Sequence, residues 1–115
     1  MSEGQSILVF GTDALLLDTR RRILENAGFG VTWSITLEDT VQSLREKDVA
    51  LLLLCHTLSS EDCERVIAVA HSITPTIVIL ALATTSGPCV EKSDVVVHQM
   101  SGPQKLVETV QTILH

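Results

Sequence analysis

Short apolar runs alternate with longer amphipathic segments along the chain. The most apolar run, Asp48–Leu58, is almost unbroken, with an acid at its start and small polar residues after it. A strand buried on both faces has this pattern, because helices cover both sides of a parallel sheet. A run this short, followed by Ser59 and Ser60, predicts a strand rather than part of a buried helix. Its end, Cys55–Thr57, is then expected at the edge of the sheet where α/β proteins place their chemistry.

Four further segments carry strand patterns. Three are continuous apolar runs, and one alternates apolar with polar residues, which is typical of a half-exposed edge strand. The predicted strands are Ser6–Phe10, the alternating Val31–Ile35, Thr76–Leu82 and Asp94–His98.

Amphipathic segments between these strands predict helices. Thr36 with Asp39 forms a capping pattern, and Ser59 is followed by acids, so both mark helix starts. Gly28 suits the left-handed position just past a helix end. The predicted helices are Ala14–Ala27, one starting at Thr36 and ending near Lys47, one from Ser59 to before Pro75, and Pro103–Leu114. Ala83–Ser93 is too short and broken for a full helix with two connections.

Composition indicates an ordinary globular protein. The 115 residues are 45% apolar and 19% charged, enough for one domain with its own core. No apolar run reaches the roughly 20 residues that a membrane helix needs. Residues 1–6 lack the basic start and apolar core of a signal peptide. We therefore expect a cytoplasmic protein with no membrane association.

Charge and aromatic content argue against nucleic acid as a partner. The net charge is −6, and the chain has no tyrosine, two phenylalanines and one tryptophan, so a polyanion or stacked bases would bind poorly. The one basic cluster is Arg20-Arg21-Arg22, inside the first predicted helix. Three consecutive helical residues spread around the axis, so we expect these arginines, with Asp18, to face water. Leu16, Ile23, Leu24 and Ala27 are expected on the buried face of the helix.

The cysteines and histidines define no chemical motif. Three cysteines in an apparently cytoplasmic chain argue against a disulfide framework. A redox pair of Cys55 with Cys63 can be imagined, but its spacing matches no redox motif. Cys55, His56 and His98 lack the close ligand pairs of zinc sites, so no metal or cofactor is expected. Anion binding by helix N-termini at the sheet edge remains an alternative.

The order of elements resembles the receiver domain of bacterial two-component response regulators, over essentially residues 1–115. Leu24–Phe29 resembles the family's helix-ending "EEAGY", Asp48–Leu58 its "DLVLLDxxLP", and Gly102–Leu106 the start of its final helix. The resemblance implies a CheY-like (flavodoxin-like), doubly wound, five-stranded parallel sheet in the order 2-1-3-4-5. Helices would flank both faces of a single domain, with the fourth helix shortened or missing.

The same resemblance implies a phosphoacceptor pocket that has lost its chemistry. A working receiver uses an acceptor carboxylate, an acidic pair that holds Mg²⁺, a hydroxyl and a lysine, whose charges neutralise the incoming phosphoryl group. The corresponding degenerate positions are Gly11, Thr12, Asp13, Cys55, Thr84 and Gln99.

Each position departs from the family pattern in its own way. The acceptor position falls on Cys55, the acidic pair on Gly11 and Thr12, and the lysine on Gln99. Asp13, one place beyond the pair, keeps a carboxylate. The hydroxyl position is open: the strand register points to Ala81 or Ala83, with Thr84 close behind.

The sequence thus predicts a stand-alone pseudo-receiver in bacterial signal transduction, a protein-interaction module rather than an enzyme. Its expected partners are signalling proteins (a histidine kinase, a phosphotransfer protein or an output protein), bound by a monomer or weak homodimer. In the family, partners commonly dock on the fourth helix, fifth strand and fifth helix. Here the last helix, Pro103–Leu114, is the better candidate. The alternative is a small thiol-based redox sensor or enzyme that uses Cys55.

Overall fold

The computed structural model describes residues 6–55, 58–83, 92–98 and 102–114. Within these ranges, strands and helices alternate from β1 to β4, and β5 and a last helix follow. The elements are β1 (Ser6–Phe10), α1 (Ala14–Asn26), β2 (Gly30–Ser34), α2 (Leu37–Glu46), β3 (Leu51–Leu54), α3 (Ser60–Ile73), β4 (Val78–Ala83), β5 (Val95–His98) and α5 (Pro103–Leu114).

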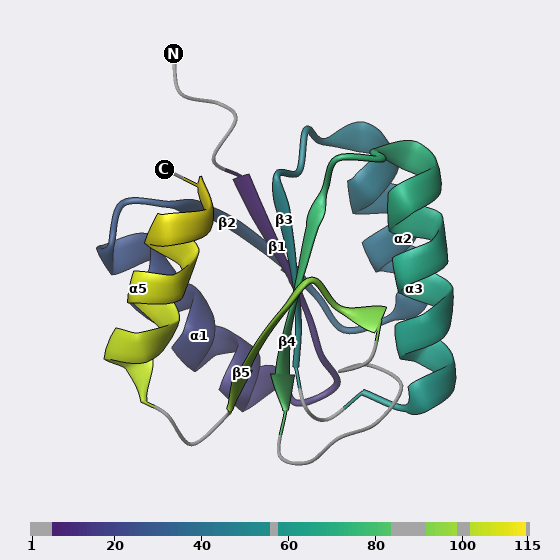
Figure 1. Cartoon of the computed structure of the whole chain (residues 1–115). Helices are drawn as coiled ribbons and strands as arrows, with labels where there is room; N and C mark the ends of the chain where they lie inside the picture. The colour runs from purple at the N-terminus through teal and green to yellow at the C-terminus, as the bar shows by residue number, and fades with distance from the viewer. Residues whose placement is uncertain (1–5, 56–57, 84–91, 99–101, 115) are drawn as a thin grey trace.

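The strands form one parallel sheet in the order β2-β1-β3-β4-β5, as predicted. Helices α1 and α5 cover one face, and α2 and α3 cover the other (Figure 1). The sequence predicted that the fourth helix is shortened or missing. This prediction concerns mainly residues 84–91, which lie outside the described residues. Among the helices described, none has the length and apolarity required to cross a membrane.

The predicted central strand, β3, lies at the middle of the sheet between β1 and β4. All four of its leucines are fully buried. Side chains alternate between the two faces of a strand. Leu51 and Leu53 therefore join the core under α1 and α5, whereas Leu52 and Leu54 join the core under α2 and α3.

The helix boundaries follow the predicted signals. The Thr36 hydroxyl accepts from the Asp39 amide at 3.1 Å, and the Ser59 hydroxyl accepts from the Asp62 amide at 3.1 Å. Each contact satisfies one amide that has no partner inside its helix. Gly28, just past α1, has a φ of 99°, which confirms the left-handed position. These local residues therefore fix where the helices begin and end.

The edge strand β2 is half-exposed as predicted. At its carboxyl end, however, the apolar residue is exposed and the polar residue is buried. Trp33 is 44% exposed, whereas Ser34 is buried. The Thr40 hydroxyl donates to the Thr36 carbonyl at 2.8 Å, so its oxygen accepts the proton of the Ser34 hydroxyl. This buried hydroxyl pair explains why a polar residue takes the inward position.

We expect Leu53→Ala to lower the free energy of unfolding by about 2–5 kcal/mol, because it leaves a cavity in a fully buried strand. Urea unfolding followed by circular dichroism measures the change. Leu15→Ala is the matched control, since Leu15 is 74% exposed and its loss should cost less than ~0.5 kcal/mol. Equal effects of the two substitutions would contradict the central role of β3.

Candidate functional site

The candidate site lies where β1 and β3 end next to each other at the carboxyl edge of the sheet. Gly11 directly follows β1, and Cys55 directly follows β3. The Cys55 amide donates to the Phe10 carbonyl at 3.0 Å, which continues the β1–β3 pairing past the last strand residues. The structure therefore brings together the two positions that the resemblance assigned to an acid and to the phosphoryl acceptor.

Gly11 and Cys55 are packed too closely for two larger side chains. A Cβ atom added at Gly11 would lie 2.9 Å from the Cys55 Cβ and 3.0 Å from its Sγ, and 3.3 Å from Cδ2 of Leu17. Carbon atoms in van der Waals contact are about 3.5–4.0 Å apart. Glycine is therefore required here for close approach, and Cys55 fills the space in front of it.

Asp13, the carboxylate next to the Gly11 and Thr12 positions, serves as a helix cap. Asp13 is the N-cap of α1, and its Oδ1 accepts from the amides of Leu15 and Leu16 at 3.0 and 3.3 Å. A carboxylate at this end also interacts favourably with the helix dipole. This local role explains Asp13 without a metal ion. No group of three or more potential metal ligands occurs within the described ranges.

Arg20 is the functional-site residue that the sequence interpretation missed. We expected all three arginines to face water, but Arg20 is only 8% exposed. Leu17, Arg20 and Leu24 are the buried residues of α1, at spacings of three and four. The sequence already shows this spacing of a buried helix face, but we predicted a surface position for Arg20 because it is charged. The prediction is correct for Arg22, whose side chain is 71% exposed and pairs with Asp18 at 3.1 Å.

The Arg20 side chain approaches Cys55 from α1. Burial raises the pKa of the Cys55 thiol above its ordinary value near 9.0. The guanidinium of Arg20, through its charge and a hydrogen bond, partly offsets this rise in pKa, whereas the charge of Asp13 adds to it. The net result is a thiol that is 2% exposed and protonated at neutral pH.

The other predicted positions fall around this pair or outside the described residues. Thr12 is exposed, in the connection from β1 to α1. Ala81 is a buried residue within β4, and Ala83 is the last residue of that strand. Thr84 and Gln99, which follow β4 and β5 in the sequence, lie outside the described residues, as does His56.

The cysteine interpretation needs one correction. Cys63 is disulfide-bonded, and Cys55 is a free thiol. The argument against disulfides is therefore wrong at Cys63, and a Cys55–Cys63 pair does not form. An odd number of cysteines excludes complete pairing but not a single bond.

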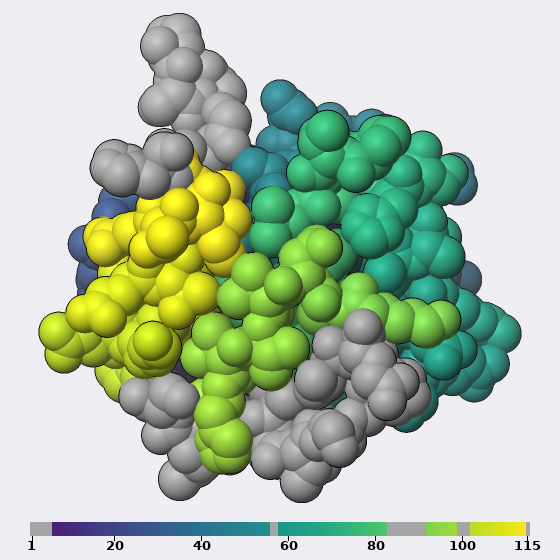
Figure 2. Space-filling model, in the orientation of Figure 1, coloured from purple at the N-terminus to yellow at the C-terminus, as the bar shows by residue number. Residues whose placement is uncertain are grey.

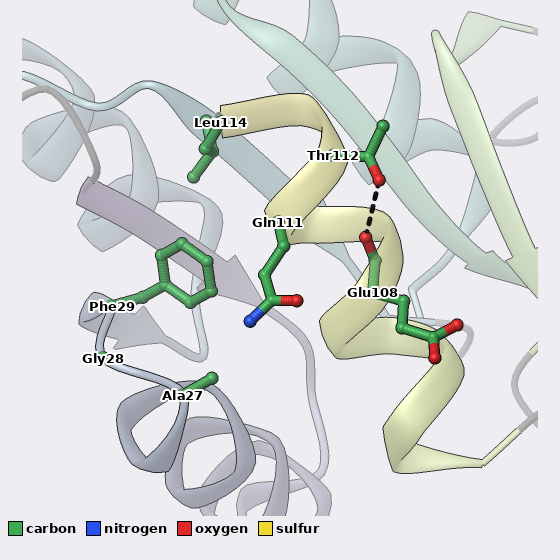
Figure 3. Close-up of a pocket in the computed structure, with 7 residues that line it drawn as sticks. All are labelled: Ala27, Gly28, Phe29, Glu108, Gln111, Thr112 and Leu114. Carbon is green, nitrogen blue, oxygen red and sulfur yellow. Dashed lines mark hydrogen bonds between the residues drawn. The ribbon is translucent and has the colours of Figure 1, made fainter.

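A second hollow lies at the opposite end of the sheet. It has a volume of about 630 Å³ and lies between the α1–β2 connection and α5. Figure 3 shows the Phe29 ring beside Gln111 and Leu114, while the Glu108 carboxylate points away from the ring. The Thr112 hydroxyl donates to the Glu108 carbonyl at 2.9 Å, a contact internal to α5. This hollow therefore contains no converging reactive groups.

Solved structures similar to this chain include several receiver domains. A response regulator receiver domain protein (CheY-like) from Methanospirillum hungatei is 20% identical, with 96% of this chain and 93% of that chain covered and a TM-score of 0.79. A response regulator from Thermotoga maritima is 16% identical, with 95% and 96% covered and a TM-score of 0.80. The signal receiver domain of an HD domain-containing protein from Pseudomonas fluorescens is 16% identical, with 95% and 93% covered and a TM-score of 0.83. No family model and no curated protein matches the sequence.

These likenesses, together with the strand order, define the class of fold. The chain is a receiver-like domain with the CheY-like doubly wound α/β architecture. At these identities the likeness describes the fold alone, so the chemistry has to be argued from the Gly11–Cys55 pair and its surroundings.

We expect Gly11→Ala to destabilise the domain by about 1–3 kcal/mol, because the new methyl group overlaps Cys55. Adding Cys55→Gly should reduce this penalty, since it removes both of the closest atoms. Urea unfolding of the two single variants and the double variant gives the coupling energy. Gly30→Ala is the matched control, because an added Cβ there meets nothing within 4 Å. Additive effects at Gly11 and Cys55 would contradict the close packing.

Proposed function

We propose that this chain is a receiver-like signalling module that acts through protein contacts and is not phosphorylated at the usual position. The packing of Cys55 against Gly11 carries the proposal. A buried, protonated thiol stands at the acceptor position, and the glycine beside it leaves no space for a neighbouring carboxylate.

The chemistry of phosphoryl transfer supports the same conclusion. Mg²⁺ requires near-octahedral oxygen coordination and is held through carboxylates together with the phosphate oxygens. Gly11 offers no side-chain oxygen, and Asp13 is occupied by two amides of α1. Without the metal, the Arg20 guanidinium beside Cys55 does not replace the divalent cation with which a working receiver neutralises the charge on a transferring phosphoryl group.

The surface formed by α5 and β5 is our candidate for partner binding. Figure 2 shows these two elements side by side on one face of the molecule. Lys105, Glu108 and Gln111 are exposed on α5, and Val96 of β5 is 44% exposed. Val97 joins the core under α1 and α5, so Val96 points to the opposite side of the sheet. The exposed polar side chains of α5 are therefore the part of this surface that suits a modest, reversible protein contact. We propose a histidine kinase, phosphotransfer protein or output protein of bacterial signalling as the partner of this monomer or weak homodimer.

The test is affinity capture by this domain from a lysate of the source organism, before and after treatment with acetyl phosphate and Mg²⁺. We expect a signalling protein of these three kinds to be recovered equally in both states. The intact mass should show no phosphoryl adduct, whereas a working receiver treated in parallel should gain one. Lys105→Ala with Glu108→Ala should abolish the capture.

The matched control is Glu64→Ala with Arg65→Ala, which removes one acid and one base from the exposed face of α3. Capture should survive in this variant. A phosphoryl adduct on the folded protein would overturn phosphorylation-independence. Capture that is lost in both double variants would contradict the assignment of the surface to α5 and β5.

A thiol-based function is the second candidate, because Arg20 lies beside Cys55 and lowers its pKa in part. Burial has the larger effect and opposes it, so we expect slow labelling of Cys55 by iodoacetamide at pH 7 in the native protein. Labelling should become fast in denaturant, as measured by peptide mass. In the native state it should rise only as the pH passes above 9.0, the ordinary value for this thiol.

Fast labelling of native Cys55 at pH 7 would contradict this assignment and favour the thiol function. Cys55→Ser is the control that identifies the labelled peptide, since the other cysteines remain in that variant. The same raised pKa makes the stabilising contribution of Cys55 complete below pH 9.0 and lost above it, because the unfolded thiol ionises first.

A further inference from the structure

A small cavity lies on the α1/α5 face of the sheet, next to the candidate site. It has a volume of about 150 Å³ and is enclosed by α1, β4, β5 and the start of α5. Its lining includes the apolar residues Leu82 and Leu106. Arg20, His98 and Gly102 also line it. At about 30 Å³ for each water molecule in the liquid, this space equals roughly five waters. Its occupant must therefore be small.

Arg20 brings an uncompensated positive charge to this cavity. The residue is 8% exposed, and its Nη1 atom is buried without a hydrogen-bond partner. Its neighbours Arg21 and Arg22 both pair with Asp18, but among the described residues no carboxylate pairs with Arg20. The Cys55 thiol is protonated and does not neutralise the guanidinium. A buried charge of this kind calls for an anion.

The start of α5 adds a second positive feature to the same cavity. Gly102 and Pro103 line it, and α5 runs for 12 residues from Pro103. The first amides of a helix have no partner within it, and the helix dipole places partial positive charge there. At α1, α2 and α3 a side-chain oxygen of the cap residue accepts from these amides. Gly102, with a φ of 95°, has no side chain to do so.

We propose that this cavity binds a small oxyanion of the phosphate or carboxylate type. Arg20 would hold the anion through its buried guanidinium, and the α5 N-terminus would face it from the other side. A planar guanidinium suits oxyanions because it offers parallel N–H donors. The site lies between α1 and α5, next to the acceptor position, and the Arg20 side chain borders both. The proposal goes beyond the proposed function and does not depend on it.

The test is a two-dimensional ¹H–¹⁵N NMR titration of the domain with sodium phosphate and, separately, with sodium acetate. Ionic strength is held constant with sodium chloride. We expect saturable shifts confined to the amides of residues 16–23, 82, 97–98 and 102–106. Saturation by phosphate alone would identify a phosphate site, and saturation by acetate alone a carboxylate site. Arg20→Met should weaken anion binding at least about tenfold, because it removes one charge-assisted hydrogen-bonding contact.

Arg22→Met is the matched control, because that side chain is 71% exposed and lies on the same helix. Its titration should match that of the unaltered protein. Shifts that do not saturate with either ion, that spread over the surface, or that persist in Arg20→Met would overturn the proposal. If Arg20→Met does not fold, Arg20→Lys retains the charge without the planar fork. It should show weaker phosphate binding at the same amides, and undiminished binding would also overturn the proposal.

Discussion

The whole domain depends on burying β3 on both of its faces. Its leucines cannot all be covered by one layer, because successive side chains point to opposite sides of the sheet. Leu53 requires α1 and α5, while Leu52 requires α2 and α3. The two helical layers and the parallel sheet therefore follow from a few apolar positions. The carboxyl edge, where Cys55 lies, is a consequence of the same arrangement.

At that edge, close packing and helix capping hold the side chains in place. Gly11 lies against Cys55, Asp13 caps α1, and Arg20 extends from α1 toward the thiol. Each of these contacts is explained by local packing or capping. Together they leave a compact edge with an arginine that lines a cavity and pairs with no acid among the described residues. The edge is therefore organised by packing and capping.

The sequence was sufficient for the elements because their signals are local. Thr36 and Ser59 cap the helices that they were predicted to cap, and Gly28 has the predicted left-handed conformation. Ser6–Phe10 was predicted with its observed bounds, since an apolar run next to a Gly-Thr-Asp turn has few alternatives. The strand order came from the resemblance, because strand pairing depends on contacts far apart in the chain.

The site was only partly predictable, for the same reason. The position of Cys55 at the end of β3 could be predicted, but its contact with Gly11 depends on how closely two strands approach. Arg20 has the helical spacing of a core residue, yet its charge argued for the surface. Burial of a charge depends on groups from other elements, which the pattern of one helix does not reveal. The bond of Cys63 likewise depends on proximity in space.

The Gly11–Cys55 contact also limits the mutational routes open to this protein. Any residue other than glycine at position 11 would place its Cβ 2.9 Å from the Cβ of residue 55 on the present backbone. An acid introduced at Gly11 by a single substitution would be penalised until the backbone beside Cys55 moves away. Substitutions at the two positions are therefore expected to be non-additive, so the side chains that position 11 tolerates depend on the residue at position 55.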